Sequence, residues 1–283
     1  MKMDPRVSQK IAFSLLFLAT LLVVLPVGFI LFVIVRDGIS AISWEFLTAM
    51  PKMGMREGGI FPAIIGTIYL VIGTLTFALP LGVLSAIFLT EYAKDNILTR
   101  LVKLAVINLA GVPSVVFGLF GFGIFVVFFK FGVSILAGSL TLAIMVLPVI
   151  ITTSKEALDS VPYAFREVSL SLGATKWQTI RYAVLPHALP GILTGIILAV
   201  SRAAGETAPI LFTVAAFYLP KLPNSIFDQV MALPYHLYVI STQVPNVAVN
   251  VRYGTALVLL AMVLTMNLVA IVVRSHFRKK KKW

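Results

Sequence analysis

Long apolar runs alternate with short polar segments along nearly the whole chain. Six of these runs are about as long as the roughly 20 residues that an α-helix needs to cross a bilayer. The pattern therefore predicts an all-α integral membrane protein with six transmembrane helices. The predicted spans are residues 11–35, 60–89, 101–129, 133–153, 189–217 and 254–273.

Several of the predicted spans contain an internal proline, namely Pro80, Pro113, Pro148 and Pro209. Proline removes one backbone donor and leaves a carbonyl unpaired one turn earlier, so we expect these helices to bend. In the fifth span, Pro209 is expected to leave the Gly205 carbonyl unpaired.

Composition supports a membrane location. The 283 residues are 59% hydrophobic and only 12% charged, whereas soluble domains are near 45–50% apolar and about 25% charged. There is no cysteine, which excludes a disulfide framework and a thiolate metal site. The three histidines are scattered without metal-ligand spacing, so we expect no metal site. The first apolar run is too long for a signal-peptide core and lacks a small-residue cleavage site, so we interpret residues 11–35 as a retained anchor.

The basic residues predict the orientation. With the N-terminus inside, sixteen of the 23 Lys and Arg residues lie in inner segments, six lie outside, and Arg202 lies within a span. Positive charge accumulates on the cytoplasmic side, which predicts that both termini are cytoplasmic. The net charge of +12 and the basic run at residues 278–282 then indicate contact with lipid headgroups rather than nucleic acid.

Two predicted external segments, residues 36–59 and 218–253, combine aromatic residues and prolines with few charges. Such loops could hold short interfacial helices that dock an external partner, or they could only cap the bundle. The sequence leaves both interpretations open.

The polar segment of residues 154–187 interrupts the apolar pattern on the predicted inner side. Pro162 suits the first turn of a helix, Gly173 is placed to end it, and a second helix can begin in residues 174–182. This predicts a cytoplasmic knob that an amphipathic helix presents to a partner's groove, or alternatively a helix lying flat in the headgroup layer. The predicted apolar face holds Val161, Phe165, Val168 and Leu172, with Arg166, Glu167 and Ser171 off that face.

Two opposite charges stand within the fifth predicted span. Arg202 and Glu206 are four residues apart, so they share one helical face and can pair. A charged side chain at bilayer depth costs at least about 2.5 kcal/mol and marks a candidate functional site. We hypothesise that Arg202 offers a transient counter-charge to an anion, that Glu206 limits the strength of binding, and that Thr207 adjoins this path. The alternative is a purely structural salt bridge.

The polar segment resembles the signature of permeases in ATP-binding-cassette importers, E-A-A-x-x-x-G-x(9)-I-x-L-P. Glu167, Gly173, Leu185 and Pro186 match at the required spacing, while Val168, Ser169 and Ala183 replace the alanines and the isoleucine. The resemblance implies a type I importer permease fold whose coupling helix fits a cleft of a cytoplasmic ATPase. It carries the coupling role to Phe165, Arg166, Glu167, Val168, Leu172, Gly173, Leu185 and Pro186.

Further segments resemble the phosphate-specific branch of this family from about Trp44 onward. They are residues 58–67, 91–92, 109–114, 170–177, 202–209 and 232–236. The resemblance implies a phosphate importer in the prokaryotic inner membrane. In such an importer this chain pairs with an unlike sister permease, two copies of an ATPase subunit bind below, and a soluble phosphate-binding protein docks outside. The expected domains are a permease core of residues 60–274, a cytoplasmic segment of residues 1–10 and a basic tail of residues 275–283.

The chain is not expected to be an enzyme by itself. It has no G-x-x-x-x-G-K-[ST] phosphate loop, so ATP would be bound by the partner ATPase and no cofactor is expected here. Two alternatives stay open: a permease for a related oxyanion such as sulfate or molybdate, and an ATP-independent secondary transporter that uses Arg202 and Glu206.

Overall fold

The structure is a computed structural model that describes residues 5–279, and it is mostly helical. Five helical stretches are long and apolar enough to span a membrane, and one bent helix pair brings the number to six. This agrees with the six predicted spans. The part of the predicted basic run at residues 280–282, and Lys2 near the start, lie outside the described residues. The five long stretches are Gln9–Ala41, Phe61–Tyr92, Ile135–Asp159, Lys176–Gly205 and Val249–Arg278.

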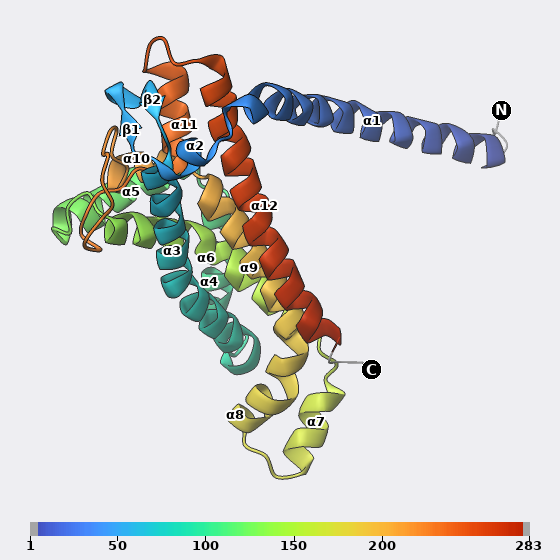
Figure 1. Cartoon of the computed structure of the whole chain (residues 1–283). Coiled ribbons are helices and arrows are strands. Elements are labelled where there is room, and N and C mark those ends of the chain that lie inside the picture. The colour runs from blue at the N-terminus through green and yellow to red at the C-terminus, as the bar shows by residue number, and fades with distance from the viewer. Residues whose placement is uncertain (1–4, 280–283) are drawn as a thin grey trace.

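Three helices form the centre of the bundle (Figure 1). They are α3 (Phe61–Ile87), α6 (Ile135–Asp159) and α9 (Leu185–Gly205). A Cβ atom added at Gly195 of α9 would overlap Thr153 of α6, so this glycine allows a close approach of the two helices. The outer helix α12 (Val249–Lys279) packs along α9.

The third predicted span is not one helix, and this part of the prediction is wrong. It consists of α4 (Ile97–Ala110) and α5 (Ser114–Gly121), and α5 continues as the π-helical stretch η4 (Phe122–Phe128). The two halves meet at 106°. Pro113 lies at the corner with an extended ψ of 140°, and it has no N–H with which to continue α4.

The fifth span differs from its predicted bounds at both ends. It begins at Lys176, well inside the polar segment, and α9 ends at Gly205 because Glu206 adopts an extended ψ of 134°. A short helix, α10 (Ala208–Thr213), follows the break. A continuous helix to residue 217, bent at Pro209, is therefore replaced by two separate helices. Arg202 and Glu206 lie at the break rather than inside a continuous helix.

The first helix, α1 (Pro5–Gly38), leaves the bundle at a steep angle (Figure 1). It contacts α12 and the short turn η1 (Ile39–Ala41), and no residue in the most apolar stretch of its span is fully buried against the described chain. A spanning helix with a free apolar surface is suited to contact lipid or another subunit.

The two predicted external segments pack against one another at one end of the bundle. The first holds α2 (Trp44–Thr48) and an antiparallel pair, β1 (Pro51–Lys52) with β2 (Glu57–Gly58), joined by η2 (Met53–Met55). The second holds α11 (Leu233–Thr242). The Tyr218 hydroxyl donates to the Pro51 carbonyl at 3.1 Å, and the Leu233 amide donates to Thr67 Oγ1 at 2.8 Å. Both segments therefore contain short helices and also cap the bundle.

His236 of α11 makes this cap sensitive to acid. The side chain is 3% exposed, and burial lowers the pKa of His236 to about 4 from its ordinary 6.5. The folded state resists protonation that the unfolded chain accepts, so stability is fully present above pH 6.5 and falls toward pH 4. Each unit of pKa corresponds to about 1.4 kcal/mol, so we expect a loss of about 3 kcal/mol over this range.

Thermal unfolding of the purified protein at pH 7 and pH 4.5 measures this loss. A His236→Gln variant should show a smaller drop in Tm between the two pH values. The matched control is His276→Gln, in a histidine of α12 whose replacement should leave the drop unchanged. An equal drop in His236→Gln and the unaltered protein would refute the assignment.

Candidate functional site

The polar segment forms a compact projection at the end of the bundle opposite α11 (Figure 1). After α6 the chain makes α7 (Ala164–Ser171), turns at Gly173, and makes α8 (Lys176–Gln178). Gly173 has a φ of +83°, and its amide donates to the Leu170 carbonyl at 3.0 Å. The predicted left-handed glycine end of the first helix is therefore confirmed.

The second helix of the projection is not separate from the following span. Thr175 and Gln178 form a reciprocal capping box at the start of α8. A π-helical stretch, η5 (Thr179–Val184), then leads without interruption into α9 at Leu185. The part of the signature from Lys176 to Pro186 is thus the first part of a spanning helix.

The predicted apolar face of α7 is divided between the interior and the surface. Val161 is 4% exposed and Phe165 packs against the same buried cluster. Val168 is 60% exposed and Leu172 is 82% exposed, and Glu167 is also exposed. Of the residues to which the resemblance assigns ATPase coupling, Val168 and Leu172 are therefore exposed near the end of α7, whereas Phe165 packs inward.

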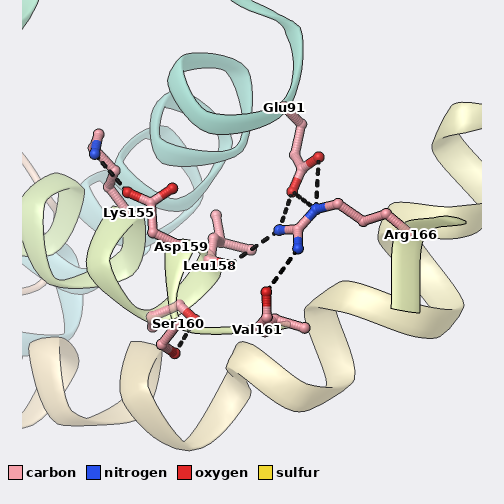
Figure 2. Close-up of polar contacts among 8 residues, drawn as sticks. Glu91, Lys155, Leu158, Asp159, Ser160, Val161 and Arg166 are labelled. Atoms are coloured by element: carbon pink, nitrogen blue, oxygen red, sulfur yellow. Dashed lines mark hydrogen bonds and ion pairs between the residues drawn. The ribbon is translucent and has the colours of Figure 1, made fainter. Parts of the chain in front are cut away.

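Arg166 does not lie on the exposed polar face that the helical periodicity indicated. Its side chain points inward and fastens the projection to the end of the second span (Figure 2). Its side chain is 11% exposed and pairs with Glu91, whose side chain is 8% exposed. Arg166 Nη2 donates to Glu91 Oε1 at 2.7 Å, and Nε donates to the same oxygen at 3.1 Å. Nη1 donates to the Val161 carbonyl at 2.9 Å, and Nη2 also donates to the Leu158 carbonyl at 3.0 Å.

Glu91 reaches Arg166 from the last turn of the second span. There α3 widens into the π-helical stretch η3 (Phe88–Tyr92). Sequence reasoning noted Glu91 and Tyr92 only as part of the family resemblance and gave them no role. The available signal was an acidic residue at the end of an apolar run. Its nearest basic neighbour in sequence is Lys94, so nothing in the sequence favoured Arg166 as its partner.

A cavity of about 530 Å³ lies beside this ion pair. Glu91, Arg166, Tyr163 and Lys176 contribute to its wall. The cavity therefore lies between the polar segment and the end of the second span.

The predicted pairing of Arg202 with Glu206 is confirmed. Arg202 Nε lies 3.3 Å from Glu206 Oε1, and the two side chains are 32% and 19% exposed. Within residues 5–279 the two terminal nitrogens of Arg202 donate no hydrogen bond to the protein. Thr207 is the next residue in the break between α9 and α10, and its carbonyl accepts from the Leu211 amide at 3.2 Å. Two opposite charges therefore lie at a helix break inside the bundle, and the positive one, the Arg202 guanidinium, keeps its two terminal nitrogens free of acceptors from the described residues.

A prediction concerns the glycine that shapes the projection. Gly173→Ala puts a Cβ into open space, so its cost of about 1–2 kcal/mol comes from the left-handed backbone alone. We expect α7 to shift and binding of a partner ATPase to weaken about tenfold, measured as a Kd with purified subunits. The matched control is Gly132→Ala, which has a φ of +69° in equally open space and lies between η4 and α6. Equal binding by both variants would contradict the role of the turn.

Comparisons with known proteins agree on one family. Residues 78–283 match the model of the "Binding-protein-dependent transport system inner membrane component" family. "Phosphate transport system permease protein PstA 1" of Mycobacterium tuberculosis is 33% identical over 98% of this chain and 91% of that protein. "Probable ABC transporter permease protein YqgI" of Bacillus subtilis is 32% identical over 95% of both chains.

A solved structure shows the same fold. A chain of a bacterial ABC transporter involved in the import of the acidic polysaccharide alginate superposes with a TM-score of 0.68, at 14% identity, over 96% of this chain and 99% of that chain. At this identity the likeness concerns the fold alone, and it agrees with a type I importer permease. The family match, the relatives and the spanning helices together identify this chain as a multi-pass inner-membrane protein of the binding-protein-dependent transport system permease family.

Proposed function

We propose that this chain is the membrane-spanning permease subunit of an ATP-driven importer of inorganic phosphate. The observation that carries the proposal is its similarity over nearly full length to permeases that are named for phosphate transport. The guanidinium of Arg202 at the helix break explains chemically how phosphate could be bound, since a guanidinium donates paired hydrogen bonds that fit a phosphate anion.

The projection formed by α7 and α8 is proposed to dock a cytoplasmic ATPase subunit. An amphipathic helix end with exposed apolar side chains fits a hydrophobic groove, and Val168 and Leu172 supply such side chains. Two copies of the ATPase would serve this chain and an unlike sister permease. This arrangement places the projection and both termini in the cytoplasm, as the basic residues also predict.

The opposite end of the bundle is proposed to face a soluble phosphate-binding protein. The cap there holds α2, the β1–β2 hairpin and α11, and a hydrogen bond from Tyr218 to Pro51 joins the two external segments. Such a cap provides a fixed surface for a partner, and a movement of α11 would reach the bundle through Leu233 and Thr67.

At the break between α9 and α10, Arg202 and Glu206 are proposed to hold the ion transiently. The guanidinium has donors that Glu206 does not occupy, so an entering phosphate can bind beside the existing pair. Because Glu206 neutralises part of the charge, the ion is held weakly enough to leave. A pathway with a fully exposed cluster of arginines would bind phosphate too tightly for release.

Uptake by reconstituted vesicles tests this function. Proteoliposomes that contain the chain, its sister permease and the ATPase are loaded with ATP and supplied with the binding protein and labelled phosphate. We expect phosphate accumulation that requires ATP and all the partners. Accumulation of sulfate or molybdate in place of phosphate, or uptake by the chain alone without ATP, would contradict the proposal.

A further inference from the structure

The Arg166–Glu91 pair connects helices that are not consecutive in the chain (Figure 2). Arg166 belongs to α7, Glu91 belongs to the end of the second span, and the carbonyl groups of Leu158 and Val161 come from the end of α6 and the turn after it. One guanidinium therefore binds three parts of the structure at once. The acceptors lie in different directions, so the arginine is held in one orientation.

A second contact runs parallel to the first. Lys176 Nζ lies 4.9 Å from the centre of the Tyr92 ring, within the range of a cation–π interaction. Tyr92 directly follows Glu91, while Lys176 begins the helix that continues into α9. Two neighbouring residues of η3 thus contact both helices of the projection.

Apolar packing surrounds these two contacts. Ala86 and Ile87, from the end of α3, lie in one buried cluster with Leu158, Ile180 and Val184. This cluster joins the end of α3 to α6 and to η5 of the projection. Movement of the projection against α3 would therefore require this packing and the polar contacts to break together.

From these contacts we propose that Glu91 is a positioning residue. Through it, α3 transmits movement of the projection into the bundle, in addition to the transmission through α9. The inference rests on the proposed function. When the ATPase displaces α7, the displacement reaches α9 through Leu185 and Pro186 along the chain. It also reaches α3 through Arg166 and Glu91, and α3 packs extensively on α6 in the centre of the bundle.

An ion pair suits this task better than an apolar contact. A buried ion pair adds little net stability compared with well-packed apolar side chains. Its value here is directional, because apolar surfaces can slide past one another. The hydrogen bonds of Arg166 to Glu91 and to the Leu158 and Val161 carbonyls instead fix how α7 is oriented against η3 and the end of α6. The π-helical stretch η3 that carries Glu91 also favours a functional role, since such turns are rare and concentrate at functional positions.

The experiment compares coupling ratios in the fully reconstituted importer. Phosphate molecules transported per ATP hydrolysed are measured for the unaltered complex and for Glu91→Gln. We expect ATP hydrolysis to persist in Glu91→Gln while transport per ATP falls about tenfold, the effect of one weakened charged hydrogen-bond pair. Glu91→Asp, which keeps the charge, should recover most of the ratio.

The matched control is Asp95→Asn. Asp95 pairs with Arg100 at 2.9 Å close to the same helix end, but the two side chains are 70% and 67% exposed. This control should leave the ratio unchanged. If Glu91→Gln does not assemble, Arg166→Lys decides in the same way, because lysine keeps the charge but cannot serve all the acceptors.

The outcomes separate the two proposals. Parallel falls in hydrolysis and transport, with an unchanged ratio of transport to hydrolysis, would mean that the ion pair is only structural. This result would overturn the proposed transmission through Glu91 and α3. A failure of the unaltered complex to couple ATP to phosphate would instead refute the proposed function.

Discussion

Replacing Arg202 with glutamine is expected to lower phosphate uptake about 10- to 100-fold while the importer still assembles. Glutamine removes the charge and the donor fork, and a hydrogen bond to a charged group contributes about 1.5–3 kcal/mol, which is this range of rates. Uptake of labelled phosphate by reconstituted vesicles measures the effect. Co-purification of the partner subunits shows whether the complex forms.

The matched control is Arg274→Gln in α12. Arg274 is another arginine of a spanning helix, and its Nη1 donates to Thr194 Oγ1 at 3.2 Å. The control should retain most of the uptake. Normal uptake by Arg202→Gln would contradict a role in the path.

Glu206→Gln separates a pathway role from a structural salt bridge. In the pathway account, loss of the carboxylate leaves Arg202 more attractive to phosphate, so both KM and kcat should fall. In the structural account, Arg202→Gln and Glu206→Gln break the same salt bridge, so both should lower the yield of the assembled complex to the same extent. The direction of the change in KM therefore distinguishes the two accounts.

The second large effect concerns the route from the projection to the pathway. Inserting a flexible Gly-Ser linker after His187 is expected to uncouple ATP hydrolysis from uptake, so that hydrolysis continues while transport falls to near background. His187 lies in the first turn of α9, with its ring 4.7 Å from that of Phe165 in α7. A linker there interrupts the continuous helical stretch that leads from the docking projection to Arg202.

A control insertion is available in the turn between η4 and α6. Gly132 lies in this turn, with a φ of +69° in open space. The same linker after Gly132 should leave transport per ATP unchanged. Unchanged coupling after the His187 insertion would count against transmission through α9.

The sequence predicted the spans well because bilayer thickness imposes a length on apolar runs that is visible residue by residue. It did not show where a span breaks. Pro113 and Pro209 were expected to bend helices, but the 106° corner at Pro113 and the extended Glu206 depend on packing against neighbouring helices. For the same reason, the fifth span starts at Lys176, where the residues are too polar to suggest a spanning helix.

The candidate site was predictable to a similar extent. Local signals sufficed for the Gly173 turn and for the Arg202–Glu206 pair, since both depend on neighbours within one helical turn or cap. The Arg166–Glu91 pair joins residues 75 positions apart, and helical periodicity placed Arg166 on a solvent-facing side. Long-range pairing depends on how helices meet, which a single sequence does not specify.

One measurement directly tests whether this chain couples ATP hydrolysis to phosphate import. ATP hydrolysis by the purified, assembled complex in lipid is compared with and without the phosphate-loaded binding protein. We expect hydrolysis to rise with the phosphate-loaded binding protein and not to rise with sulfate in place of phosphate. Hydrolysis that is indifferent to phosphate, or that rises equally with sulfate, would contradict this coupling.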